Sequence, residues 1–307
     1  MATQIFVLMV GFIMLMKGAD WFVDGAAGIA KRFAIPPLVI GLTIVAMGTS
    51  APEAAVSITA ALKDNAGITI GNVLGSNILN TLIILGLASV ITSIAVARST
   101  VIVEIPYMLG ITLLLAVLGY TGQSITFIEG VVLWAAFILY LCYLFRVSVV
   151  DREDPTEETE NVSVKKLVLF IAVGILLILF GSDFAVDAAT KIAQIMGMSE
   201  RFIGLTIVAF GTSLPELVTS VSASRKGEAD IAIGNIVGSN IFNILFVVGT
   251  TALITPVLFE TKFLVDALVA AASGVLLWVC VWKKGKLTRG GGIVMLGAYA
   301  AYFAYLL

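Results

Sequence analysis

Histidine is absent from this chain of 307 residues, cysteine occurs twice, and charged residues make up only 12% of the sequence. The missing histidine removes the commonest transition-metal ligand and the usual proton shuttle. Cys142 and Cys280 lie in apolar segments without metal-ligand spacing, so we expect them to be packing residues. A soluble domain carries about 25% charged residues, and this chain is 60% hydrophobic. These proportions exclude a soluble fold, and the lack of a basic patch excludes nucleic acid as a partner.

Apolar runs of membrane-spanning length recur along the chain and predict an integral membrane protein. Because a basic leader and cleavage site are missing, we expect the first run to be a retained helix. The only sizeable polar stretch, Val149–Val164, is acidic and leaves five spans on each side. The ten predicted spans are 4–27, 35–61, 67–93, 99–118, 125–146, 166–194, 200–223, 230–254, 261–282 and 288–306.

The two halves of the chain are copies of each other. IGLTIVAMGTSAPE (40–53) matches IGLTIVAFGTSLPE (203–216) at 12 of 14 positions, and GNVLGSNILN (71–80) matches GNIVGSNIFN (234–243) at 7 of 10. Both matches have an offset of 163 residues, which indicates duplication. Five spans are an odd number, so the second copy must be inverted in the membrane. We predict an all-α fold of ten transmembrane helices in two inverted five-helix repeats, 1–148 and 165–307, joined by an acidic linker, 149–164.

Basic residues are distributed unequally between the two predicted membrane faces. With ten spans, both termini lie on one face, and 13 of the 18 basic residues fall on the other. The positive-inside rule then predicts a multi-pass protein of the cell membrane with extracellular termini and a cytoplasmic linker.

The motifs GTSAPE and GTSLPE lie in the middle of apolar spans, where proline should break the helix. Such a break frees carbonyl groups at membrane depth, which is tolerable where they line a cavity or bind an ion. Glu53 and Glu216 follow the two prolines. An ionisable residue at the bilayer centre costs about 2.5–3.5 kcal/mol. Carboxylate, carbonyl and hydroxyl oxygens suit hard cations such as Ca²⁺ and Na⁺.

Polar residues on the following spans are spaced to join this site. Asn72, Ser76 and Asn80 share one helix face, and Asn235, Ser239 and Asn243 repeat the pattern. Asn72 and Asn235 could equally well serve to hold helices together.

Four aspartates lie near the ends of spans, namely Asp20, Asp24, Asp183 and Asp187. We expect them to face an interface or cap a helix, with a role in gating left open. Lys17, unmatched in the second copy, is expected to pair with Asp20 or Asp24.

The paired GTSxPE and GNxxGSNxxN segments resemble the α-repeats of the Ca²⁺/cation antiporter superfamily, in particular its sodium/calcium exchanger branch and prokaryotic relatives. The resemblance covers essentially the whole chain. It implies the sodium/calcium exchanger fold, with spans 2, 3, 7 and 8 as the ion-binding core and spans 1 and 6 as a sliding gate. The ion ligands that it implies are Glu53, Glu216, Asn80, Asn243, Thr49, Thr212, Ser76, Ser239, Ala46 and Ala209.

The expected function is Ca²⁺ for Na⁺ exchange by alternating access, with no enzyme activity and no cofactor beyond the transported ions. Asn243 looks more like the potassium-independent branch. Coupling to H⁺, transport of another divalent cation and a cation channel stay open as alternatives. An intramembrane protease is disfavoured because histidine is absent and the aspartates lie near span ends. The sequence does not give the oligomeric state, for which a monomer is the working expectation, and the lipid bilayer is the predicted surrounding.

Overall fold

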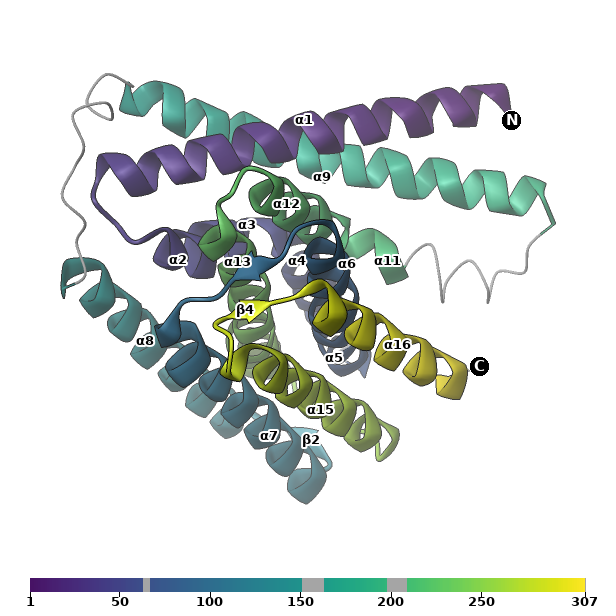
Figure 1. Cartoon of the computed structure of the whole chain (residues 1–307). Coiled ribbons are helices and arrows are strands. Elements are labelled where there is room, and N and C mark those ends of the chain that lie inside the picture. The colour runs from purple at the N-terminus through teal and green to yellow at the C-terminus, as the bar shows by residue number, and fades with distance from the viewer. Residues whose placement is uncertain (63–66, 151–162, 198–208, 307) are drawn as a thin grey trace.

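The computed structural model describes residues 1–62, 67–150, 163–197 and 209–306, and Figure 1 shows the arrangement of its helices. Short π-helical turns, labelled η, interrupt several spans, as expected near functional sites. The helices and turns are α1 (Ala2–Arg32), α2 (Pro37–Ile40), η1 (Gly41–Val45), α3 (Ala46–Thr49), α4 (Ala51–Leu62), α5 (Gly67–Leu79), η2 (Asn80–Ile84), α6 (Leu85–Ile91), η3 (Thr100–Glu104), α7 (Ile105–Gly122), α8 (Phe127–Val150), α9 (Val164–Ile195), α11 (Ala209–Thr212), α12 (Leu214–Arg225), α13 (Ala229–Phe242), η6 (Asn243–Val248), α14 (Gly249–Ile254), α15 (Lys262–Trp282) and α16 (Arg289–Leu306).

Most predicted spans coincide with these helices. Among the described residues, seven helices are long and apolar enough to cross a membrane, or eight if the bent pair Pro37–Thr49 and Ala51–Leu62 forms one span. The start of the predicted span 200–223 and most of the acidic linker lie outside the described residues. The all-α membrane architecture is confirmed. The packing role expected for Cys142 is wrong, because its side chain is exposed on α8.

Four two-residue strands depart from pure helix and tie the two copies together. Strand β1 (Ile94–Ala95) pairs antiparallel with β4 (Lys286–Leu287), and β2 (Ser124–Ile125) pairs with β3 (Val257–Leu258). Each pair joins a loop of the first copy to a loop of the second. The sequence did not predict them because such short pairings depend on loops that only the fold brings together.

Helices α1 and α9 lie side by side across one face of the bundle, along the top of Figure 1. They approach closely because glycines recur at the contact. A Cβ atom at Gly18 would lie 2.8 Å from the Gly174 carbonyl oxygen, and one at Gly174 would lie 2.9 Å from the Gly18 carbonyl oxygen. These close contacts fit small residues at a membrane helix interface, so α1 and α9 form one closely packed pair resting on the core.

The core of the molecule is the span formed by α13 and η6, which is buried almost throughout. It packs against η1, α3 and α12 and also contacts α5. The predicted helix breaks are confirmed on both sides of it. Helices α3 and α4 meet at Ser50 with a bend of 50°, and α11 and α12 are separated at Ser213. Both breaks therefore lie beside the most buried span.

Candidate functional site

Glu53 and Glu216 stand in the first turns of α4 and α12, directly after the two helix breaks. Both side chains are fully buried. A carboxylate in the first turn of a helix faces the positive end of the helix dipole. Neither glutamate forms an ion pair with a lysine or arginine in the described part of the chain. The two copies have therefore brought two carboxyl groups into one buried region without a basic partner among the described residues.

The environments of the two glutamates differ. The Ser50 hydroxyl donates a 2.8 Å hydrogen bond to Glu216 Oε1, across from the first copy to the second. The equivalent hydroxyl of Ser213 and both carboxylate oxygens of Glu53 have no hydrogen-bond partner among the described residues. The site is thus built from symmetric residues but is asymmetric in this conformation.

Within each copy, Asn72 or Asn235 forms hydrogen bonds to the helix that carries the glutamate. The Asn72 amide donates to Ser57 Oγ at 3.0 Å and to the Glu53 carbonyl oxygen at 3.4 Å. The Asn235 amide makes the equivalent bonds to Ser220 Oγ at 2.9 Å and to the Glu216 carbonyl oxygen at 3.3 Å. Of the two roles considered for these asparagines, these contacts favour holding helices together.

Asn80 and Asn243 are the first residues of the π-turns η2 and η6. Turn η6 packs against α4, which carries Glu53, and η2 packs against α12, which carries Glu216. Each asparagine uses its amide nitrogen in hydrogen bonds. The side-chain oxygens of both are buried and receive no hydrogen bond from any described residue.

The site is therefore rich in acceptors that lack donors. Burying an acceptor without a partner costs about 1–3 kcal/mol, and more for a charged group. Five such oxygens occur on these four residues, which makes the cluster complementary to a cation with oxygen ligands. The five atoms are Glu53 Oε1, Glu53 Oε2, Glu216 Oε2, Asn80 Oδ1 and Asn243 Oδ1.

The remaining predicted ligands lie around this cluster. The Thr49 hydroxyl donates to Asn235 Oδ1 at 3.0 Å, across the two copies. The Ala46 carbonyl oxygen, expected to be freed by the helix break, already accepts the Ser50 N–H at 3.0 Å and the Ser239 hydroxyl at 3.4 Å. It keeps its place beside the site but is not unpartnered.

Ser76 also faces the site, because its hydroxyl oxygen accepts a 3.3 Å hydrogen bond from the Asn243 amide. Thr212 is partly buried at the end of α11. Ala209 begins that helix, and its side chain lies outside the described residues.

A cavity of about 470 Å³ approaches the site from one side. It lies between α4, α9 and α11, and its lining includes Pro52, Ala55, Asp183, Gly211 and Thr212. Pro52 directly precedes Glu53 and Thr212 directly precedes Ser213. The cavity therefore reaches the residues next to Glu53 and Ser213 along α9.

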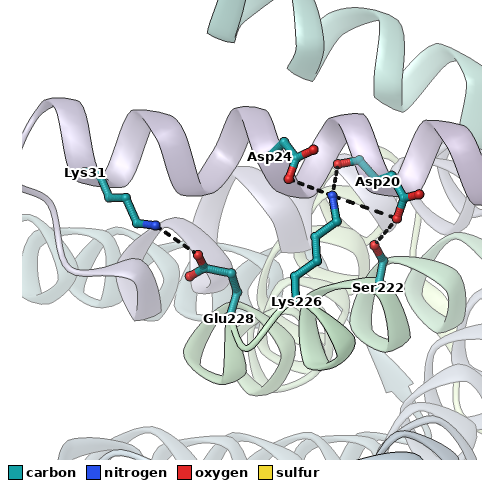
Figure 2. A network of polar contacts seen from close by, with 6 residues as sticks. All are labelled: Asp20, Asp24, Lys31, Ser222, Lys226 and Glu228. Atoms are coloured by element: carbon teal, nitrogen blue, oxygen red, sulfur yellow. Dashed lines mark hydrogen bonds and ion pairs between the residues drawn. The ribbon is translucent and has the colours of Figure 1, made fainter. Parts of the chain in front are cut away.

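The equivalent contact of α1 carries a polar network, shown in Figure 2, beside a cavity of about 590 Å³. Lys226, at the end of α12, forms a 2.6 Å ion pair with Asp24 and donates to the Asp20 carbonyl oxygen at 2.8 Å. The Ser222 hydroxyl donates to Asp20 Oδ1 at 2.7 Å. Lys31 pairs with Glu228 at 3.3 Å on the same side. The expected pairing of Lys17 with these aspartates is wrong, because Lys226 occupies them from another helix.

On α9 the equivalent aspartates behave differently. Asp187 pairs with Lys191 one turn along its own helix at 2.5 Å, and Asp183 lines the cavity beside Thr212. Among the described residues, Asp24 of α1 forms an ion pair with Lys226 at the end of α12. The ion pair of α9 joins Asp187 and Lys191, which both belong to that helix. Cavities lie beside both contacts, one lined by Asp20 and Val218 and the other lined by Asp183 and Ala55.

Among the buried polar residues that the sequence did not single out are Asn77, Asn240 and Glu104. Asn77 and Asn240 lie inside the repeated GSN motif and contact Asn243 and Asn80 across the copies. Both are asparagines at the same position of their copies, 163 residues apart, and this repetition could have indicated them. Glu104 is buried apart from the cluster, and its Oε1 accepts a 2.5 Å hydrogen bond from Tyr143. Glu104 lies in neither repeated motif, so the comparison of the two copies does not indicate it.

Comparison with known proteins gives consistent matches over the full length. A family model described as sodium/calcium exchanger protein matches residues 3–146 and 166–307. The chain is 40% identical to the putative antiporter CaxA of Alkalimonas amylolytica, over 100% of this chain and 99% of that protein. It is 29% identical to the sodium/calcium exchanger MaX1 of Methanosarcina acetivorans, over 98% and 97% of the two chains.

A solved structure has the same fold. The sodium-calcium exchanger NCX_Mj, soaked with Na⁺ and Sr²⁺, is similar at a TM-score of 0.86 and 34% sequence identity, covering 98% of this chain and 97% of that one. At that level of similarity the helix arrangement described above is that of the NCX_Mj structure.

The network around Lys226 generates a prediction about access. Lys226→Met should change the free energy of unfolding by no more than about 1 kcal/mol, because partly exposed ion pairs contribute little. It should nevertheless loosen α1 from α12. We expect Val218→Cys, in the cavity beneath the network, to react severalfold faster with a membrane-impermeant maleimide when Lys226→Met is also present, in a chain whose native cysteines are replaced.

The matched control is Lys262→Met, which breaks an exposed ion pair to Glu260 away from this contact. It should leave the labelling rate unchanged. Equal labelling rates with and without Lys226→Met would show that the network does not close this path.

Proposed function

This chain belongs to the sodium/calcium exchanger protein family, and from that membership we propose that it exchanges Ca²⁺ for Na⁺ across a membrane by alternating access. The observation that carries the proposal is the cluster of five buried acceptor oxygens without donors, two of them on Glu53. Such a cluster of carboxyl and amide oxygens suits transported hard cations.

The charges of the site explain why the two ions would compete. Glu53 and Glu216 together neutralise one Ca²⁺, and the same pair can instead attract more than one Na⁺. With neither ion bound, two desolvated carboxylates repel each other. Moving the carrier through its occluded state without a bound ion therefore costs free energy. This cost couples the movement of one ion to the return of the other.

We assign the central ligands by their buried oxygen atoms, which receive no hydrogen bond from a described residue. Glu53 and Glu216 supply the charge, and Asn80 and Asn243 complete the central site with neutral oxygens. Ser76, Ser239, Thr49, Thr212 and the carbonyl groups of Ala46 and Ala209 are proposed to line the flanking Na⁺ positions.

The repeated cavities support alternating access. One lies beside Asp183 and Thr212 and the other beside Asp20 and Val218, at equivalent positions of the two copies. We infer that transport opens them in turn, with the closely packed pair of α1 and α9 sliding over the core.

We further propose that residues 1–148 and 165–307 act as two inverted units, joined by the acidic linker 149–164. The charge bias supports a cell-membrane protein with both termini outside and the linker in the cytoplasm. The cavity along α9 would then open outward.

The central ligands can be tested by removing one carboxylate at a time. Glu53→Gln and Glu216→Gln should each reduce Ca²⁺ uptake into proteoliposomes by two orders of magnitude or more, because removing a buried charge partner costs about 3 kcal/mol or more. Glu104→Gln is the matched control, since it removes a carboxyl group that is equally buried but lies outside the cluster. Substantial exchange by either site variant would refute the central site.

The coupling ion can be tested by varying Na⁺, K⁺ and pH independently. Proteoliposomes loaded with Na⁺ should take up ⁴⁵Ca²⁺ at fixed pH, and uptake should saturate with Ca²⁺ and not require K⁺, since Asn243 leaves the site with two carboxylates. Uptake driven by a pH gradient without Na⁺ would replace sodium coupling with proton coupling. Flux that neither saturates nor needs a counter-ion would favour a channel.

Orientation can be tested with two exposed lysines on opposite predicted faces. In a chain without its native cysteines, Lys262→Cys should react with an impermeant maleimide added to intact cells, whereas Lys286→Cys should react only after the membrane is opened. The reverse pattern would invert the proposed topology.

A further inference from the structure

We propose that Asn77 and Asn240 are positioning residues of the ion site, each fixing the ligand amide that belongs to the opposite copy. This inference rests on the proposed function, since it concerns how the Ca²⁺ ligands are oriented. Neither residue is itself expected to bind the ion.

The hydrogen bonds cross between the copies in a reciprocal pattern. The Asn80 amide nitrogen donates to Asn240 Oδ1 at 3.1 Å, and the Asn243 amide nitrogen donates to Asn77 Oδ1 at 3.2 Å. The offset of 163 residues converts one bond into the other. The same contact has therefore been built twice, with nearly the same length, by the two halves of the inverted repeat.

This contact decides which end of each ligand amide faces the cluster. A primary amide carries its oxygen and its nitrogen on opposite sides of one carbon atom. With the nitrogens of Asn80 and Asn243 held by the opposite copy, their oxygens point the other way, and both are the unpartnered acceptors of the cluster. A flipped amide would present N–H groups to a cation, which repel it.

The side-chain polar atoms of Asn77 and Asn240 are already engaged in hydrogen bonds. Asn77 accepts from Asn243 and donates to the Asn240 carbonyl oxygen at 3.1 Å. Asn240 accepts from Asn80 and donates to Thr81 Oγ1 at 2.9 Å and to the Asn77 carbonyl oxygen at 3.4 Å. Each of their side-chain oxygen and nitrogen atoms takes part in at least one bond, and both residues are buried. A connected polar network of this kind holds its members in one geometry.

The side-chain bonds to main-chain carbonyl oxygens also join α5 directly to α13. These helices belong to the core on which α1 and α9 rest. Asn77 and Asn240 therefore attach the ligand amides to the core helices α5 and α13. In the proposed mechanism these helices stay in place while α1 and α9 slide.

Asparagine meets both demands at these positions. The side chain must accept from the opposite ligand and donate to the opposite carbonyl oxygen, which aspartate cannot do when ionised. An apolar residue would remove one hydrogen bond from the opposite ligand amide and one from the opposite carbonyl oxygen. Serine is too short to span both contacts.

Double-mutant cycles on Ca²⁺ binding test the crossed pattern. We measure Ca²⁺ affinity of the purified full-length protein by calorimetry for Asn77→Ala, Asn240→Ala, Asn80→Ala, Asn243→Ala and their double combinations. Each positioning variant should weaken binding roughly tenfold, because neighbours in one network couple strongly. Asn240→Ala should add little to Asn80→Ala, and Asn77→Ala little to Asn243→Ala. The pairs Asn77 with Asn80 and Asn240 with Asn243 should be close to additive.

Thr251→Val is the control, because it removes a buried hydroxyl that bonds only within its own span, at 2.8 Å to the Val247 carbonyl oxygen. It should leave Ca²⁺ affinity unchanged. A purely structural role would lower the thermal midpoint of each variant but give no crossed coupling. If an alanine variant does not fold, Asn77→Ser and Asn240→Ser replace it, and the same crossed pattern is required.

The outcomes separate this inference from the proposed function. Additive effects in all four pairs, or coupling within one copy only, would overturn the positioning role while leaving Ca²⁺ exchange in place. Absence of Ca²⁺ binding by the unmodified protein would overturn both.

Discussion

The structure depends on two carboxylates that are buried near each other without a base. Glu53 and Glu216 cannot share their charge with a lysine or arginine, because those that the structure describes lie outside the cluster. Two desolvated like charges destabilise the interior unless a cation lies between them or one carboxyl group takes up a proton. The π-turns and the orientation of the asparagine amides place further oxygen acceptors in the same buried region. A bound cation, as proposed, would offset the repulsion.

Because of the inverted duplication, the same residue types occur twice in the cluster, once from each copy. One set of motifs, repeated with opposite orientation in the membrane, supplies both glutamates and both asparagines of the cluster. The two copies are not used identically in the present conformation. Ser50 bonds to Glu216, while Ser213 has no partner among the described residues. Because the residues are equivalent, the reverse pattern, with Ser213 bonded to Glu53, would use the same groups.

Much of the fold and the central site could be predicted from the sequence, and for physical reasons. Apolar length, the proline breaks and the 163-residue offset determine the spans, the inversion and the pair Glu53 and Glu216. The contacts between copies could not be predicted in this way. Asn77 looked like one more polar residue in a motif, because its partner Asn243 is 166 residues away. Lys17 was matched with Asp20 by sequence proximity, whereas the actual partner Lys226 is 206 residues from it. The carbonyl group of Ala46 was expected to be free, but a helix that breaks can still satisfy its carbonyl groups through the next turn.

The reliance on neutral ligands has a further consequence. Two carboxylates and two amides give the cluster a charge of −2, which one Ca²⁺ cancels completely. A third carboxylate in place of Asn243 would leave a net negative charge in the occluded state, and a further cation would be needed to neutralise it. The amides avoid that cost, but an amide is useful to a cation only when its oxygen faces it. Charge and orientation are therefore linked: the fewer the carboxylates in such a site, the more it depends on residues such as Asn77 and Asn240 that hold neutral ligands the right way round.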